Sequence, residues 1–290
     1  MPHLELAAVS KSFKSNKVLD DISLAVQAGE IVVIFGPSGT GKTVLLRLIA
    51  GVEEPTSGKI SINDQDMADV APEHRDVGMA FQNFALFPHL NAFENIASPL
   101  RARSQSESQI KEGVARVARL LKIDHVLGHA PRQLSNGQKQ RTALARALAS
   151  SPKLLLLDDP LRNVDAKLRF EMRLELPRLL RQAKSTVLYV TQDYKEAMAL
   201  ADRIAVLAHG KFVQVATPEE IYRHPATVSV ARLFGDPTIN LIETVMSEGA
   251  TFDLAGATVA IDKAYAALKG RAVTVGVRPE AVELSAGAAS

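Results

Sequence analysis

The sequence predicts an α/β fold followed by a small β-rich domain, and three observations support this. The segment "IVVIF", residues 31–35, is apolar throughout, which is typical of a parallel strand covered on both faces. A glycine-rich turn and the helical pattern "KTVLLRLIAG" follow it, so the three together form the start of a parallel α/β unit. From about residue 238 the pattern changes to short strands at close spacing, which predicts a separate all-β domain.

The remaining elements follow in chain order. "DISLAV" alternates polar and apolar residues, as a strand with one covered face does. Residues 91–150 carry helical patterns, and Ser135 and Gln138 have the S-x-x-Q spacing of a capping box. Apolar strand-like runs return at 154–157 and 185–191, each followed by a helical pattern. The last strand-like segments are "NLIETVMS", "TFDLA", "TVAI" and "AVTVGVR", and the tail "SAGAAS" is expected to be disordered.

The composition argues against several classes of protein. The 290 residues are 47% hydrophobic and 23% charged, with a net charge of +2, which does not indicate nucleic-acid binding. Without cysteine the chain cannot form disulfides, thiolate zinc sites or cysteine nucleophiles. We expect no signal peptide, and no run approaches the roughly 18 apolar residues that cross a bilayer. Any membrane role is therefore expected to depend on partner proteins.

The segment "GPSGTGKT", residues 36–43, fits the phosphate-binding pattern G-x-x-x-x-G-K-[ST] in full. Its glycines let backbone N–H groups surround an anion, and the helix N-terminus points at the same place. Lys42 is expected to bind the β- and γ-phosphates, and Thr43 to bind Mg²⁺. The alternative is a chance match, but the motif follows a buried strand and opens a helix, as the mechanism requires. The predicted nucleotide site comprises Gly36, Pro37, Ser38, Gly39, Thr40, Gly41, Lys42 and Thr43.

The segment "KLLLLDDP", residues 153–160, ends an apolar strand in two carboxylates. A P-loop protein needs an acid at the end of such a strand, opposite the P-loop hydroxyl, so Asp158 is predicted to hold Mg²⁺ through water. The alternative is an N-cap or an Asx turn before Pro160. Taken alone the turn would be preferred, but beside a P-loop the metal-binding role is preferred.

Several segments, in order, resemble the ATP-binding subunits of ABC transporters. They are "GPSGTGKT" (Walker A), "AFQNFALFPHL" (Q-loop), "LSNGQKQR" (signature), "LLLLDDP" (Walker B), "LRNVDAKLR" (D-loop) and "YVTQDYKEAMALADRIAVL", where the family has its switch histidine. The segments "TPEEIYRHP" and "VGVRPE" are similar to the importer branch that serves sugars, polyols and sn-glycerol-3-phosphate.

The resemblance implies a domain organisation. Residues 1–235 would form a P-loop ABC ATPase core, with a helical subdomain at about 91–150. Residues 236–290 would form a small β-rich domain resembling a regulatory domain of the oligonucleotide/oligosaccharide-binding (OB) type. In the family more strands follow "VRPE", so this domain is expected to be incomplete here.

The resemblance also implies roles for single residues. Phe13 matches the aromatic residue that stacks on adenine, with an aromatic packed on the sheet as the alternative. Gln82 would reach Mg²⁺ and the attacking water. Its neighbours Phe84, Leu86 and Phe87 would form either core or a groove for a helix of the membrane subunits. The signature residues assigned to the nucleotide of a second subunit are Ser135, Asn136, Gly137 and Gln138, and the D-loop residue is Asp165.

The catalytic positions depart from the family pattern. Asp159 replaces the usual glutamate and is shorter by about 1 Å, a misplacement that can slow a reaction about 100-fold. Gln192 replaces the switch histidine, and it can orient water but cannot take up a proton near neutral pH. Asn136 is a mild departure, and Arg162 stands where the D-loop often has serine, which is expected to alter subunit cross-talk. The catalytic set Asp159, Gln82 and Gln192 is therefore expected to be slow.

Together these expectations describe an ATP-binding and ATP-hydrolysing subunit, with ATP and Mg²⁺ as cofactors, that powers an importer of a carbohydrate, polyol or glycerol-phosphate solute. The implied partners are two integral membrane permease subunits, an extracytoplasmic solute-binding protein, and a second ATPase subunit in a homodimer or a heterodimer. The chain would lie peripherally at the cytoplasmic face of the inner (plasma) membrane. The alternatives are a nearly inactive nucleotide-binding partner of a second ATPase, and a soluble ABC protein of repair or translation, against which the single cassette argues.

Overall fold

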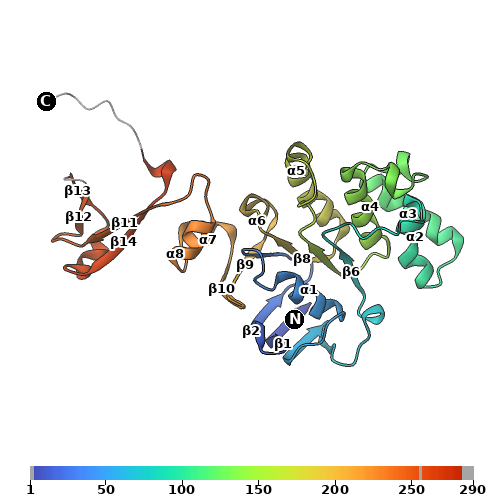
Figure 1. Ribbon diagram of the computed structural model, residues 1–290, viewed down its shortest axis with the longest axis horizontal. Helices are drawn as coiled ribbons and strands as arrows, with labels where there is room; N and C mark the ends of the chain where they lie inside the picture. The colour runs from blue at the N-terminus through green and yellow to red at the C-terminus, as the bar shows by residue number, and fades with distance from the viewer. Residues whose placement is uncertain (1–2, 255–256, 283–290) are drawn as a thin grey trace. The chain divides into compact units, whose positions relative to one another are not determined.

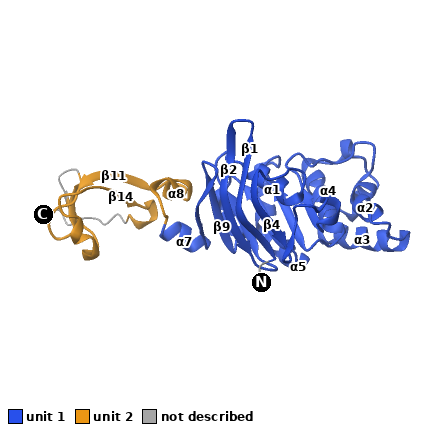
Figure 2. Ribbon diagram, turned by 90° about the horizontal axis from the view of Figure 1, so that it is seen from below, with its two compact units in different colours: residues 1–224 blue, residues 225–290 orange. Residues whose placement is uncertain are grey.

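The computed structural model describes residues 3–254 and 257–282. The chain divides into two compact units, Met1–His224 and Pro225–Ser290 (Figure 2). The tail "SAGAAS", for which the sequence predicts disorder, lies outside the described residues. Within the described residues no helix is both long enough and apolar enough to cross a membrane.

A six-stranded sheet forms the centre of the first unit, in the order β10-β9-β3-β8-β7-β6 (Figure 1). Its strands are β3 (Ile31–Phe35), β6 (Val77–Ala80), β7 (Leu154–Asp158), β8 (Thr186–Thr191), β9 (Arg203–Ala208) and β10 (Lys211–Ala216). All neighbours pair in parallel except β9 and β10. Every residue of β3, β7 and β8 is buried, which confirms the prediction of apolar strands covered on both faces. Because parallel strands share one carboxyl edge, the residues that follow β3, β7 and β8 lie at the same edge.

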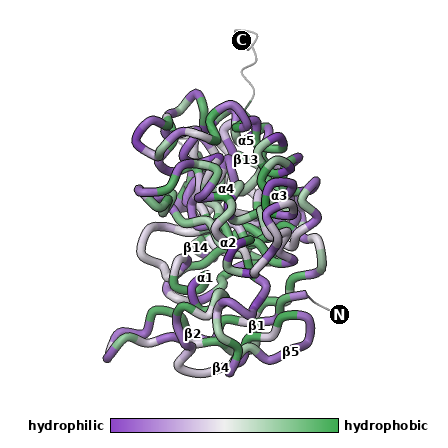
Figure 3. The backbone as a smooth tube through the Cα atoms, turned by 90° about the vertical axis from the view of Figure 1, so that its right-hand side faces the viewer, coloured by the Kyte–Doolittle hydropathy of each residue, from purple (hydrophilic) through white to green (hydrophobic). Residues whose placement is uncertain are grey.

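A second, antiparallel sheet has the order β2-β1-β4-β5. Its strands are β1 (Leu4–Phe13), β2 (Asn16–Val26), β4 (Ser57–Ile62) and β5 (Gln65–Asp66). Buried and exposed residues alternate along β2 beyond Leu19, and apolar and polar segments can be followed along this sheet in Figure 3. The helix α1 (Lys42–Ala50) shares one hydrophobic cluster with both sheets, represented by Leu6, Leu46 and Leu188. Burial between two sheets therefore fixes the start of α1, which directly follows β3 and its glycine-rich turn.

Helices complete the first unit. The helix α6 (Tyr194–Leu200) packs on β3, β8 and α5 (Ala166–Ala183). The helices α2 (Ala92–Ala102), α3 (Glu107–Leu120) and α4 (Asn136–Ala149) pack on one another, and α4 also packs on β6. These three helices occupy the stretch for which the sequence predicts helices. The last helix of this unit is α7 (Pro218–Arg223).

In its described residues the second unit contains a short α-helix, two 3₁₀ helices and two small antiparallel sheets. The α-helix and strands are α8 (Val228–Leu233), β11 (Asn240–Val245), β12 (Thr251–Leu254), β13 (Ala257–Ala260) and β14 (Ala272–Val277), and the 3₁₀ helices are η4 (Lys263–Leu268) and η5 (Pro279–Ala281). β11 pairs with β14, and β12 pairs with β13. Met246, Ala250 and Phe252 form its hydrophobic core. The Arg278 guanidinium donates to the backbone oxygens of Ala231 and Phe234, so the segment before the expected boundary at residue 235 belongs with this unit.

Candidate active site

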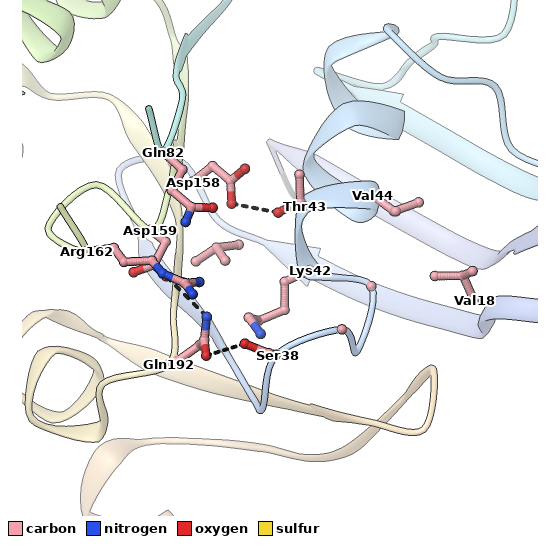
Figure 4. A pocket seen from close by; sticks show the side chains of 13 residues that line it. Val18, Ser38, Lys42, Thr43, Val44, Gln82, Asp158, Asp159, Arg162 and Gln192 are labelled. Carbon is pink, nitrogen blue, oxygen red and sulfur yellow. Dashed lines mark hydrogen bonds and ion pairs between the residues drawn. The ribbon is translucent and has the colours of Figure 1, made fainter. Parts of the chain in front are cut away.

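Residues 36–43 join β3 to α1 and form part of a pocket of about 280 Å³ (Figure 4). Gly41 is the N-cap of α1 with a φ of 100°, and a Cβ there would lie 2.8 Å from the Leu19 side chain. Only glycine fits such a position. Among the described residues no side chain caps α1, so side-chain capping does not occupy its first backbone N–H groups. Helix N-termini of this kind bind phosphate groups.

Lys42 provides the charge of this loop. The side chain is 6% exposed, and its Nζ donates to the backbone oxygens of Gly36 at 2.8 Å and Pro37 at 2.6 Å. Burial lowers the pKa of Lys42, while the nearby carboxylates of Asp159 and Asp158 act in the opposite direction. The ammonium therefore lies inside the loop with two carboxylates near it.

Thr43 and Asp158 meet across the pocket. The Thr43 hydroxyl donates to Asp158 Oδ1 at 3.0 Å, which joins the first turn of α1 to the end of β7. Burial raises the pKa of Asp158, and the hydrogen bond from Thr43 opposes this shift. Gln82 also lines the pocket. This set consists of oxygen ligands, with one carboxylate, one hydroxyl and one amide, which suits Mg²⁺ when phosphate oxygens complete the shell.

Asp159 belongs to a chain of polar contacts on the other side of the pocket. Ser38 Oγ donates to Gln192 Oε1 at 2.7 Å, and Gln192 Nε2 donates to Asp159 Oδ2 at 3.3 Å (Figure 4). Arg162 Nη1 lies 3.7 Å from the same oxygen. Burial raises the pKa of Asp159, Arg162 lowers it, and Asp158 raises it further. Two side chains therefore contact the oxygen that the sequence assigns to water activation.

The segment after Gln82 is held by backbone contacts and exposes one aromatic ring. Asn163 donates to the Gln82 backbone oxygen at 2.9 Å. The Asn95 side chain accepts from Phe87 N at 2.8 Å and donates to its backbone oxygen at 3.1 Å. The Phe87 ring is nevertheless 44% exposed, with the Arg146 guanidinium 5.5 Å from its centroid. The backbone is fixed here while the ring remains accessible.

Phe13, Asp165 and the signature residues do not line this pocket. Phe13 ends β1, is 42% exposed, and has Lys11 Nζ 4.8 Å from its ring centroid. Asp165 is the N-cap of α5 and accepts from Leu168 N at 2.9 Å. The signature residues begin α4, where Ser135 and Gln138 form the expected capping box.

Gly137 has a packing role of its own. A Cβ at this position would lie 2.1 Å from the Leu168 side chain, so glycine allows α4 and α5 to approach closely. The residue is buried, whereas the neighbouring Ser135 and Asn136 are exposed.

The pocket thus gathers nine of the eighteen predicted site residues. The predicted residues that line it are Ser38, Gly39, Gly41, Lys42, Thr43, Gln82, Asp158, Asp159 and Gln192. Pro37 and Thr40 line an adjoining pocket of about 410 Å³, and Gly36 accepts from Lys42. The pocket also includes four residues that were not predicted as site residues: Val18, Val44, Arg162 and Val190. The sequence marks Arg162 only as an arginine at a position where the D-loop often has serine. That unusual residue type is the signal that could have identified it as a pocket residue.

Two family models match the chain. The one described as ABC transporter matches residues 19–162, and the one described as MalK OB fold domain matches residues 235–282. These matches and the observed topology confirm the predicted fold class, an ABC ATPase core followed by an OB-type domain.

Two curated relatives and one solved structure agree with these matches. The sn-glycerol-3-phosphate import ATP-binding protein UgpC of Yersinia pseudotuberculosis serotype I (strain IP32953) is 45% identical over 286 residues, covering 98% of this chain and 80% of the relative. UgpC of Escherichia coli (strain K12) is 45% identical over 288 residues, covering 98% of this chain and 81% of the relative. The dimeric post-hydrolysis structure of the ATP-binding cassette MJ0796 bound to ADP and Pi matches with a TM-score of 0.67 and 30% identity, over 74% of this chain and 98% of that one. The chain therefore belongs to the ABC transporter family, as one of its ATP-binding, ATP-hydrolysing import subunits.

Proposed function

We propose that ATP binds at residues 36–43 of this chain and is hydrolysed there. The observation that carries this proposal is the Thr43–Asp158 hydrogen bond, because it joins the phosphate-binding loop to the end of β7 beside Lys42. In this assignment the loop N–H groups and Lys42 bind the phosphates. Phe13, whose strand partner Asn16 lines the adjoining pocket, would stack on adenine with its exposed face.

Mg²⁺ is assigned to Thr43, Asp158 and Gln82. These residues fit the ion because they supply oxygen atoms, which Mg²⁺ prefers, and the nucleotide would supply the rest. When bound, the ion would neutralise charge on the β- and γ-phosphates. The chain's own contribution is to hold Asp158 in place, through the hydrogen bond that the Thr43 hydroxyl donates to its Oδ1.

We further propose that hydrolysis is attenuated. Asp159 is assigned as the residue that orients or deprotonates the attacking water, with Gln192 and Gln82 as its neighbours. The aspartate side chain is short, and its Oδ2 is already engaged by Gln192 and Arg162. Asp159 must break its contact with Gln192 or Arg162 before this oxygen can act on water, which slows the reaction.

The solute assigned to the importer is sn-glycerol-3-phosphate or a similar carbohydrate or polyol. Both curated relatives described above are named for sn-glycerol-3-phosphate import, at 45% identity. The proposed assembly contains two membrane permease subunits, an extracytoplasmic binding protein and two ATPase subunits, at the cytoplasmic face of the membrane. In such a dimer Ser135, Asn136, Gly137 and Gln138 would contact the nucleotide of the second subunit, and Asp165 would lie at the subunit contact.

A second candidate function follows from the same departures at residues 159 and 192. The chain would then bind ATP and close with a second, faster ATPase, while hydrolysing almost nothing itself. Turnover of the purified chain separates the two candidates. Turnover that disappears in Lys42→Ala supports the enzyme, whereas tight ATP binding with background turnover supports the regulatory partner.

The solute is tested by uptake in cells that lack this gene. We expect uptake of labelled sn-glycerol-3-phosphate to fall to background and to return with the parent gene but not with Lys42→Ala. Normal uptake of that solute with lost uptake of a sugar would contradict the glycerol-phosphate assignment and leave the ATPase assignment standing.

A further inference from the structure

Arg162 lies in the loop between β7 and α5, and the backbone of that loop is firmly held. Arg169 donates to the backbone oxygens of Leu161 at 3.2 Å, Arg162 at 3.3 Å and Val164 at 3.0 Å. Arg162 N donates to the Asp159 backbone oxygen at 3.2 Å. These bonds fix the point from which the Arg162 side chain projects into the pocket (Figure 4).

The side chain itself is weakly held. Its ionic contact with Asp159 Oδ2 is 3.7 Å long, and the Arg162 side chain is 49% exposed. Asp159 is buried, but the pair is long and its arginine is half exposed, so a more highly charged anion can replace the carboxylate as the partner of Arg162. A guanidinium also binds phosphate through two parallel hydrogen bonds, which a lysine cannot form.

Arg162 and Lys42 are two cations in one pocket. They come from different elements, Lys42 from the start of α1 and Arg162 from the loop after β7 (Figure 4). Two positive charges that line one pocket repel each other. An anion placed between them would remove this repulsion.

We propose that Arg162 binds the γ-phosphate of ATP held in the same chain, exchanging Asp159 for the phosphate, and thereby favours ATP over ADP. This inference rests on the proposed ATP site at residues 36–43. When ATP is bound, Asp159 Oδ2 loses its arginine contact and becomes available to the attacking water. With ADP there is no γ-phosphate, and the Arg162–Asp159 pair persists.

The test is calorimetry of ATP and ADP binding to the purified full chain, in the presence of Mg²⁺. In Arg162→Ser we expect ATP affinity to fall about 10-fold, as for loss of a charge-assisted hydrogen bond, and ADP affinity to change less than about two-fold. Unchanged ADP affinity in the same sample also shows that the variant is folded. The ATP affinity of Arg162→Lys should lie between those of the parent and Arg162→Ser, because lysine keeps the charge but cannot form two parallel hydrogen bonds. The matched control is Arg178→Ser, which removes an exposed arginine of α5 outside the pocket and should alter neither affinity.

Three results would overturn the proposal. The first is an equal fall in ATP and ADP affinity, which would make Arg162 a general charge rather than a γ-phosphate contact. The second is an unchanged ATP affinity. The third is loss of the Arg162→Ser effect in an Asp159→Asn background, which would show that Arg162 acts only through Asp159. Lys42→Ala separates this inference from the ATP site itself, because it should weaken binding of both nucleotides even if Arg162 has no role.

Discussion

The two walls of the pocket differ in how closely they follow the family. The binding wall, residues 36–43 with Asp158, matches the family motifs at every position that carries a role. The hydrolysis wall, Asp159, Arg162 and Gln192, departs from the usual residue at each position. Phosphate binding depends on backbone N–H groups and one lysine, whereas water activation depends on a carboxylate placed to within about 1 Å. The proposed roles of the two walls therefore predict that ATP binding is retained while hydrolysis is slowed.

The largest effect should come from breaking the binding wall. In Lys42→Ala we expect ATP affinity to fall about 10-fold or more, because a direct charged contact to phosphate is lost. Calorimetry measures this, and turnover should fall to background. Lys167→Ala, at an exposed position of α5, is the control and should bind ATP normally. An unchanged affinity in a folded Lys42→Ala protein would remove the basis of the ATP site.

Adjacent carboxylates on the two walls give the next comparison. Asp158→Asn should reduce the Mg²⁺-dependent part of ATP affinity about 10-fold, because the amide cannot replace an ionised ligand. Asp159→Asn should leave the Mg²⁺-dependent part of ATP affinity unchanged and should lower the rate of ATP hydrolysis. The measurement is ATP affinity with and without Mg²⁺ for both variants. The comparison fails if the two variants lose the same amount of affinity.

The exposed ring after Gln82 tests whether the pocket is coupled to a partner. Phe87→Asp should lower transport about 10-fold or more in the assembled importer, since an apolar contact with the permease subunits is lost. ATP affinity of the purified chain should not change. Phe170→Asp is the control, because Phe170 is also an exposed aromatic, at 60%, but lies on α5. Equal transport by the parent and Phe87→Asp would show that Phe87 makes no contact that transport requires.

The smallest effect concerns a buried acid beside the hydrolysis wall. Glu196 is 2% exposed and accepts from Tyr189 and Thr191, the latter adjacent to Gln192. Burial raises the pKa of Glu196 from 4.5 to about 7. The folded chain thus binds a proton at Glu196 more tightly than the unfolded chain does. The stability that this proton contributes is complete below about pH 4.5 and is lost as the pH rises through about 7.

Glu196→Gln should remove this pH dependence. Between pH 5 and pH 8, the free energy of unfolding of the parent should fall by up to about 3 kcal/mol relative to the variant. Denaturant unfolding at the two pH values measures the difference. In the control Glu171→Gln, at an exposed position of α5, the free energy of unfolding should depend on pH as it does in the parent. Parallel curves for the parent and Glu196→Gln would mean that Glu196 does not gain a proton on folding.

The sequence predicted the binding wall and the start of α4 because the motifs that mark them are local. The glycine pattern, the apolar strands and the capping box at Ser135 and Gln138 each depend on a few consecutive residues, and the structure contains all of them. Asp158 could be paired with Thr43 because parallel strands bring their carboxyl ends to one edge.

Other features depend on contacts between distant residues and could not be predicted. The position of the loop that carries Arg162 is set by the bonds that Arg169 makes to its backbone. The close approach of Gly137 to Leu168 requires the packing of α4 on α5. The placement of α8 in the second unit depends on Arg278, which lies 47 residues after its partner Ala231.

The central claim, that the hydrolysis wall limits an otherwise sound ATP site, is tested most directly by restoring the usual residues. Turnover and ATP affinity should be measured for the parent, for Asp159→Glu combined with Gln192→His, and for Asp159→Asn. The combined variant should hydrolyse ATP at least several-fold faster with little change in affinity, because general acid–base assistance is worth about 100-fold or more when fully placed. Asp159→Asn should be slower than the parent. Equal turnover in all three proteins would contradict the account and make residue 159 catalytically silent.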